Sequence, residues 1–143
     1  MPDISQDLPV RAAPAAVFAA VSTPAGLDQW WTLRSEGSPR LGADYLLDFG
    51  PGYRWTARVT RCAPDAEFEL QLLAADDDWT GTRVRLQIDP RGEGSWLRFL
   101  HSGWPAANEH YRVSCHCWAM YLRVLRRHLE HGETVSYESR LDV

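Results

Sequence analysis

Apolar and polar residues alternate over much of the chain, which is the period of a β-strand with one buried face. The first such segment covers residues 4–11, where Pro9 favours a place at the sheet edge. Five more segments follow with short connections between them, at residues 44–49, 53–60, 68–72, 84–88 and 97–101. Short connections between successive strands are typical of an antiparallel meander. We therefore expect a sheet of about six antiparallel strands.

Helical patterns stand on both sides of this series. Ala13-Pro14 opens one short helix, and Thr23-Pro24 opens a second that runs to about Trp31, because a capping residue followed by proline suits a first helical turn. A long helix is predicted from about residue 108 to 130, with Gly132 suited to its C-terminal cap. Its apolar positions form one stripe, which indicates a helix lying on a sheet: Tyr111, Cys115, Trp118, Leu122, Leu125 and Leu129.

This order of elements predicts an α+β fold in which a curved antiparallel sheet wraps one long C-terminal helix, with two short helices between the first two strands. Residues 1–132 form this single domain, and residues 133–143 form a polar tail that we expect to be flexible. A space commonly remains between such a sheet and its helix, and it is the first candidate for a binding site.

Composition narrows the classes of function. The net charge of −4 argues against a nucleic-acid binder, since such proteins usually carry a basic stripe. All 15 basic residues are arginine, which excludes chemistry that needs a lysine Schiff base. The seven tryptophans exceed what a core of this size needs, so some are expected to line a cavity. With no long apolar run and no signal-peptide pattern at the start, we expect a cytoplasmic protein that does not insert into membranes.

Four passages occur in an order and spacing that point to a known family. They are residues 13–18, residues 23–31 with the paired tryptophans, residues 94–104 with a His-Ser-Gly-Trp end, and residues 118–132. Together they resemble the START-like (SRPBCC) helix-grip superfamily, in particular the branch related to the C-terminal domain of the Hsp90 ATPase activator Aha1. The resemblance implies an apolar cavity between sheet and helix that binds lipids, sterols, aromatic polyketides or other hydrophobic molecules. A few relatives are enzymes.

Candidate ligand-binding residues are the aromatic and polar side chains expected around this cavity. Trp30 and Trp31 end the second short helix, where each can either stack over the cavity mouth or fill the gap between helix and sheet. Inward strand positions and the helix stripe supply the others: Tyr45, Phe49, Tyr53, Trp55, Phe99, His101, Trp104, Tyr111, Cys115 and Trp118. Plain core packing is the alternative for these positions.

His101 is the most informative polar candidate, because it shares the inward parity of Leu97 and Phe99. An imidazole there can orient a ligand carbonyl or phenol, or act as a general acid or base. An enzymatic function would rest on it, with Asp48 or Tyr53 as further candidates. The alternative is a histidine bonded to a backbone carbonyl or to a tryptophan N–H.

No metal, cofactor or disulfide is expected. Cys115 and Cys117 lie two positions apart on a helix, so they point about 200° apart and cannot chelate one ion. The acidic run at residues 76–78 lacks the spaced ligands and the glycine of a calcium loop and is predicted to be a solvated hairpin. Outward strand positions carry arginines that indicate a solvated face, with a protein-binding face as the alternative: Arg54, Arg58, Arg83, Arg85 and Arg98.

Three functions follow from these observations. The first is cytoplasmic binding of a small hydrophobic or aromatic, lipid- or polyketide-like ligand between the sheet and the last helix. The second is an enzyme of the cyclase or dehydratase type that uses His101 in the same cavity. The third is an Hsp90-related protein-interaction domain, with an Hsp90-like chaperone as partner, acting through the outer sheet face or the acidic loop.

Overall fold

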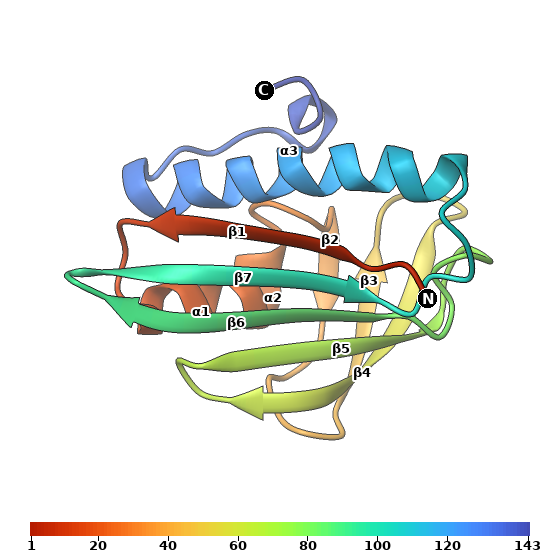
Figure 1. Ribbon diagram of the computed structural model, residues 1–143, viewed down its shortest axis with the longest axis horizontal. Coiled ribbons are helices and arrows are strands. Elements are labelled where there is room, and N and C mark those ends of the chain that lie inside the picture. The colour runs from red at the N-terminus through yellow and green to blue at the C-terminus, as the bar shows by residue number, and fades with distance from the viewer.

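Seven antiparallel strands form one curved sheet in the computed structural model, which describes residues 1–143 (Figure 1). In chain order they are β1 (Ile4–Val10), β2 (Arg34–Glu36), β3 (Asp44–Asp48), β4 (Arg54–Ala63), β5 (Glu67–Ala74), β6 (Arg83–Arg91) and β7 (Gly94–Ser102). The predicted α+β fold with an antiparallel sheet is confirmed. The sheet has one strand more than expected, because three-residue β2 is too short to show an alternating pattern.

The strands follow the order β1-β7-β6-β5-β4-β3-β2 across the sheet, so β1 and β2 are its edges. The edge position expected for the strand with Pro9 is confirmed. β1 pairs with β7 in a continuous register in which Leu8 lies opposite Leu97. The first and last strands therefore meet, and all the strands between them belong to one meander.

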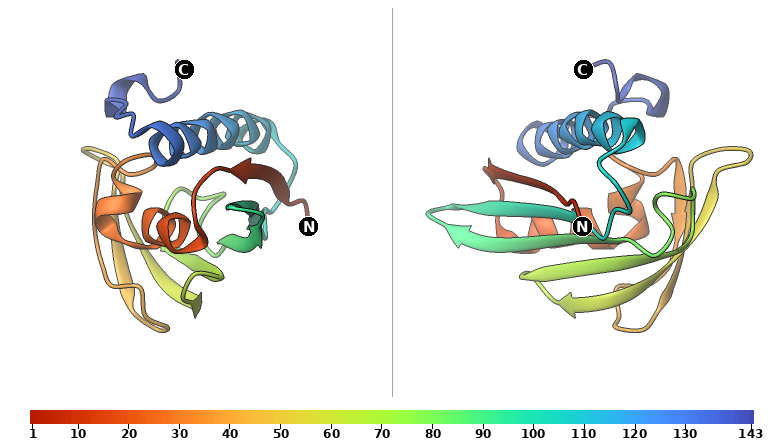
Figure 2. Two further views of the ribbon diagram at one scale, coloured as in Figure 1. Left: turned by 90° about the vertical axis from the view of Figure 1, so that its left-hand side faces the viewer. Right: turned by 45° about the vertical axis from the view of Figure 1, so that its right-hand side comes forward.

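The β4–β5 pairing is the irregular part of the sheet. The register shifts twice there, between Thr56 and Ala57 and between Val59 and Arg61. Irregularities of this kind bend a strand and increase its twist. The two views of Figure 2 show the result, since the sheet curves around the helices and leaves one side for the last helix to cover.

The two short helices lie inside this curve. They are α1 (Pro14–Ser22) and α2 (Pro24–Leu27), and the Thr23 hydroxyl accepts a bond of 3.0 Å from the Gly26 amide as the predicted cap. A Cβ at Gly26 would collide with the backbone of Ala19, so the close approach of the two helices requires glycine. α2 is shorter than predicted: it ends at Leu27, and Trp30 and Trp31 lie in the turns that follow.

The long helix α3 (Glu109–His131) closes the open side of the sheet (Figures 1 and 2). The Asn108 side chain caps its start by accepting a bond of 2.9 Å from the Tyr111 amide. Gly132 ends it in the left-handed conformation, with φ 67°. Both ends therefore agree with the prediction.

The chain after α3 folds back beside it (Figure 2) and includes the short 3-10 helix η1 (Tyr137–Ser139). Arg140 is buried, at 5% exposure. Its guanidinium donates to the carbonyl oxygens of Thr32, at 2.9 Å, and Asp28, at 2.6 Å. Flexibility of residues 133–143 stays a prediction, whereas their position against the domain is defined by these bonds.

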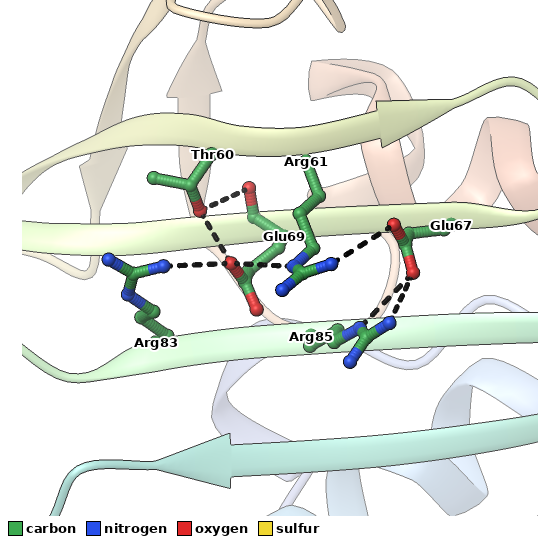
Figure 3. Close-up of polar contacts among 6 residues, drawn as sticks. All are labelled: Thr60, Arg61, Glu67, Glu69, Arg83 and Arg85. Carbon is green, nitrogen blue, oxygen red and sulfur yellow. Dashed lines mark hydrogen bonds and ion pairs between the residues drawn. The ribbon is translucent and has the colours of Figure 1, made fainter.

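The outer face of the sheet carries paired charges. Glu69 on β5 has a side chain only 6% exposed, and its carboxylate lies 3.4 Å from Arg61 Nε and 3.5 Å from Arg83 Nη1. The Thr60 hydroxyl donates to the same carboxylate at 2.8 Å. Arg85 pairs with Glu67 beside this group (Figure 3). The predicted polar outer face is thus a set of cross-strand ion pairs.

Candidate functional site

An open cleft of about 330 Å³ lies between α3, β4 and the loops that flank the strands. Tyr53 and Val113 stand at its solvent side, with exposures of 54% and 52%, whereas Trp118 at its base is 1% exposed. Ten of its thirteen lining residues are hydrophobic: Trp31, Phe49, Tyr53, Trp55, Trp79, Val113, Cys117, Trp118, Tyr121 and Tyr137. The cleft therefore offers an apolar, mostly aromatic wall with access from solvent.

The aromatic rings of this wall are in mutual contact. Trp118 stacks with Trp79 at 5.6 Å between ring centroids and an interplanar angle of 22°, and it lies 5.2 Å from Trp31. Trp55 bridges the far side, at 5.1 Å from Trp79 and 4.7 Å from Phe49. Contacting rings restrict one another's rotamers, so the wall is preorganised.

His101 lies behind this wall, fully buried, at the end of β7. The Trp118 indole N–H donates to its Nδ1 at 3.1 Å, and its Nε2 lies 2.8 Å from the Thr82 hydroxyl. That hydroxyl donates to the Trp79 carbonyl at 2.5 Å. Because an indole can only donate, Nδ1 must be the acceptor and Nε2 carries the hydrogen. One directed chain of hydrogen bonds thus joins α3, β7 and the loop before β6.

This arrangement does not support the enzymatic role considered for His101. Burial lowers its pKa to about 3, and both ring nitrogens already have partners within the chain. The geometry of His101 matches the alternative given above, a histidine bonded to a tryptophan N–H. Asp48 is equally engaged, because it accepts bonds from Arg34 at 2.9 Å and from the Gly50 amide at 2.8 Å, and the Arg34 bond holds the pKa of its carboxyl below the usual range.

Five of the predicted ligand-binding residues border the cleft. They are Trp31, Phe49, Tyr53, Trp55 and Trp118. Four come from segments around the β3–β4 turn and the turn after α2, and the fifth comes from the middle of α3. The residues chosen from the sequence thus lie on two sides of the cleft, the strand-and-turn side and the α3 side.

The other predicted residues lie elsewhere, in the core or beside β1. Trp30 is buried and donates to the Ala20 carbonyl at 2.9 Å, and Tyr45 is buried with its hydroxyl on the Ser22 carbonyl. His101, Phe99 and Trp104 are fully buried behind the cleft. Tyr111 and Cys115 are half-buried on the side of α3 that faces β1, where the Tyr111 hydroxyl donates to the Asp3 carbonyl at 2.7 Å.

The structure adds cleft residues that the sequence did not single out. Four of the six α3 residues at the cleft come from one edge of the helix, at His110, Ser114, Cys117 and Tyr121. These positions follow a helical period of their own, and that period is the signal that could have found them. The centre of the predicted stripe lies about one residue, or about 100°, around the helix from the cleft. The edge of that stripe with Tyr111 and Cys115 therefore meets β1 instead. Trp79 lies in a loop, where no period applies.

Polar groups gather where the loop after β5 meets the start of α3. His110 and Asp76 border the cleft there, and Ser114 follows one turn along the helix. His110 Nδ1 lies 3.0 Å from the Asp78 carboxylate, which also accepts a bond of 3.3 Å from the Asn108 side chain. The acidic run predicted to be a solvated hairpin is therefore tied to the helix through Asp78.

Buried tryptophan N–H groups mark the same region. The indole nitrogens of Trp79 and Trp104 are buried and have no hydrogen-bond partner in the chain. A larger groove of about 880 Å³ lies at the opposite end of α3, between Arg11, Arg91 and Arg126, but only one of its lining residues is hydrophobic. The aromatic cleft is thus the better candidate for an apolar ligand. None of the helices is long and apolar enough to span a membrane.

Comparison with known proteins identifies the family. The family model described as Activator of Hsp90 ATPase homolog 1-like protein matches residues 11–130. No protein with a curated description matches. The Aha1 dimer from Colwellia psychrerythraea is 26% identical, with a TM-score of 0.83, and the alignment covers 93% of this chain and 99% of that chain.

Two further solved structures share the fold at lower identity. CalU16 from Micromonospora echinospora is 19% identical, with a TM-score of 0.72 over 98% of this chain and 83% of that chain. DynU16, from the dynemicin biosynthetic locus, is 21% identical, with a TM-score of 0.76 over 94% of this chain and 50% of that chain. With the family match, the curved seven-stranded sheet and the long C-terminal helix, the chain belongs to the Activator of Hsp90 ATPase homolog 1-like family of the START-like helix-grip superfamily.

Proposed function

We propose that the chain binds a small hydrophobic or aromatic molecule in the cleft between α3 and the sheet. The observation that carries this proposal is the open cleft with its wall of contacting aromatic rings. Its volume of about 330 Å³ is near the lower end of the range for small-molecule sites, which is about 300–1,000 Å³. A compact ring system therefore suits it better than a long acyl chain.

The energetics of such a site favour aromatic ligands. Burial of apolar surface contributes about 25 cal/mol per Å², and the preorganised wall reduces the ordering cost of binding. A flat ligand can also stack on Trp55 or Trp79, which border the opening together with Tyr53. The shared fold with DynU16, from a biosynthetic locus, is consistent with a small-molecule role. The cytoplasmic location stays a prediction from the sequence.

The test is a titration with the neutral fluorescent probe N-phenyl-1-naphthylamine, followed by its own emission. We expect saturable binding to the wild type. Cys117→Phe places a ring inside the cleft, so it should weaken binding about tenfold or more. His116→Phe is the matched control, because His116 is the adjacent helix position but is exposed, and its affinity should equal that of the wild type. Circular dichroism would verify the fold of both variants.

Three outcomes would overturn this placement. One is a wild type that does not take up the probe at concentrations where it remains in solution. Another is a folded Cys117→Phe variant with unchanged affinity, which would locate the probe outside the cleft. Equal weakening by both variants would likewise contradict it, since His116 does not border the cleft.

A second candidate function is an interaction with an Hsp90-like chaperone. The family match over residues 11–130 and the likeness to the Aha1 dimer favour it. A pull-down with purified Hsp90 tests it directly. Retention at micromolar concentration would support the interaction, and an empty pull-down would remove it. Charge reversal at Arg58, which is half-exposed on the outer face, would then test that surface.

A further inference from the structure

Three polar side chains line one end of the cleft, and none of them carries a fixed positive charge. The three lining residues that are not hydrophobic are Asp76, His110 and Ser114. No arginine borders the cleft, so a carboxylate or phosphate on a ligand would have no cation to meet. The Asp76 carboxylate can only accept. With the Ser114 hydroxyl, which can donate or accept, this end therefore offers acceptors to a neutral ligand that donates a hydrogen bond.

His110 is held in one orientation from both sides of its ring. Its Nδ1 lies 3.0 Å from Asp78 Oδ2, and Asn108 Nδ2 donates to the same oxygen at 3.3 Å. The other atom of that amide, Asn108 Oδ1, caps α3. The imidazole lies nearly parallel to the Trp79 ring, at 25°, and its centroid is 5.5 Å from that of Trp104 in an edge-to-face arrangement. These contacts fix the ring plane before any ligand arrives.

The Asp78 contact also decides the tautomer of His110. A carboxylate accepts, so Nδ1 must carry the hydrogen. In the neutral ring this leaves the lone pair on Nε2, and Nε2 has no hydrogen-bond partner in the chain. A carboxylate behind the ring also makes the free nitrogen a better acceptor, as it does for histidines that bind metals. The ring thus keeps one unpaired acceptor, on a residue that borders the cleft.

The contrast with His101 supports this assignment. Both nitrogens of His101 are engaged, by Trp118 and Thr82, and His101 does not border the cleft. His110 borders the cleft and keeps one nitrogen free. Of the two histidines near the aromatic wall, only His110 can therefore meet a ligand without losing an existing bond.

We infer that His110 is the polar anchor of the cleft and that its Nε2 accepts a hydrogen bond from the hydroxyl group of a phenolic aromatic ligand. This inference rests on the proposed function and gives its ligand a chemical class. The aromatic wall would hold the ring system, and the hydroxyl would point toward the start of α3. Asp78 and Asn108 act as positioning residues behind the anchor.

The test compares 2-naphthol with 2-methoxynaphthalene, which has the same ring system but no donor, by competition against N-phenyl-1-naphthylamine. We expect the wild type to bind 2-naphthol about three- to tenfold more tightly, the range for one net hydrogen bond. His110→Phe keeps a ring against Trp79 but removes the acceptor, so the preference should disappear. His116→Phe, on the exposed side of the same helix, should keep it.

A second measurement does not depend on a variant that folds. A long-range ¹H–¹⁵N spectrum of the wild type should show His110 as the Nδ1–H tautomer, and 2-naphthol should shift its Nε2 resonance more than 2-methoxynaphthalene does. Equal affinity of the wild type for the two compounds would overturn the anchor and leave the cleft proposal intact. Failure of both compounds to compete for the cleft would instead count against the proposed function itself. A His110→Phe variant that keeps the preference would also overturn the anchor.

Discussion

The indole N–H of Trp118 donates to Nδ1 of His101 across 3.1 Å, and this bond connects the middle of α3 to the end of β7. Trp118 is also the base of the aromatic cleft. The position of the cleft floor therefore depends on a hydrogen bond formed behind it. From His101 the chain of bonds continues through Thr82 to the carbonyl of Trp79, which is a second ring of the same wall.

Replacement of His101 by leucine should be strongly destabilising. The indole of Trp118 and the hydroxyl of Thr82 would both lose a buried partner, and each unsatisfied group costs about 1–3 kcal/mol. We expect His101→Leu to lower the free energy of unfolding by about 3 kcal/mol in urea denaturation. His101→Gln should cost less, because its amide oxygen can accept from Trp118 while its nitrogen donates to Thr82. Equal costs for the two variants would show that the directed chain does not matter.

The same histidine predicts a dependence of stability on pH. Its pKa is about 3 in the folded protein, against about 6.5 in an unfolded chain, since burial opposes the charged form. Below pH 6.5 the unfolded state therefore binds a proton that the folded state does not. The contribution is complete above pH 6.5 and falls toward pH 3, by up to about 1.4 kcal/mol per pH unit.

Paired denaturation curves at pH 7 and pH 4 measure this effect. The wild type should lose more stability on acidification than His101→Gln, which does not titrate. His116→Gln, at an exposed position, should behave like the wild type. A difference between wild type and His101→Gln that stays constant over this range would contradict a low pKa for His101.

Local patterns predicted most of the fold, because each depends on neighbours in the sequence. The alternation of Val84, Leu86 and Ile88 marks a strand with one buried face, and all three are buried. Thr23 and Gly132 act as the helix caps that their types favour. The strand that the sequence did not predict, β2, is three residues long, which is too short for an alternating pattern to be recognised.

The cleft was harder to predict, since it depends on the rotation of α3 about its axis. Trp118 faces the sheet whether the helix turns its Cys115 side or its Cys117 side toward the cleft. A rotation of α3 about its axis by about 100°, the angle between successive residues, would bring Cys115 to the cleft in place of Cys117. Trp79 and Asp78 lie in a loop, and their contacts reach more than thirty residues along the chain to His110. The partners of Arg140 lie 108 and 112 residues away. No short-range pattern contains these contacts.

The C-terminal segment should contribute to stability through Arg140. Its guanidinium is buried and donates to the carbonyl oxygens of Thr32 and Asp28, and hydrogen bonds with a charged partner contribute about 1.5–3 kcal/mol. We expect Arg140→Ala to lower the free energy of unfolding by about 2 kcal/mol. Arg123→Ala, on the exposed face of α3, should change it by less than about 0.5 kcal/mol.

The same variant bears on the cleft. Tyr137 lines the cleft and its hydroxyl donates to the Phe49 carbonyl at 3.2 Å, so release of the segment would remove one wall. Faster amide hydrogen exchange in residues 134–143 of Arg140→Ala would show that release. Exchange and stability equal to those of the wild type would show that Arg140 does not hold the segment.

The outer face offers a comparison of two glutamates on the same strand. Glu69 is 6% exposed at its side chain and meets Arg61, Arg83 and Thr60, whereas Glu67 is 22% exposed and pairs chiefly with Arg85. Removal of Glu69 would leave Arg83 without its anion and Arg61 with only its contact of 3.9 Å to Glu67. We expect Glu69→Ala to lower the free energy of unfolding by about 2 kcal/mol, because breaking a buried ion pair leaves its partners uncompensated. Glu67→Ala should cost about 1 kcal/mol or less, as for pairs near the surface.

Salt separates the two cases. In 1 M NaCl the Debye length is about 3 Å, so the effect of Glu67→Ala should nearly vanish. The effect of Glu69→Ala should persist, since its side chain is only 6% exposed and its carboxylate also accepts a bond from Thr60 (Figure 3). Urea denaturation of both variants at low and high salt measures this. Equal costs that fall together with salt would mean that Glu69 behaves as a surface charge, despite its burial.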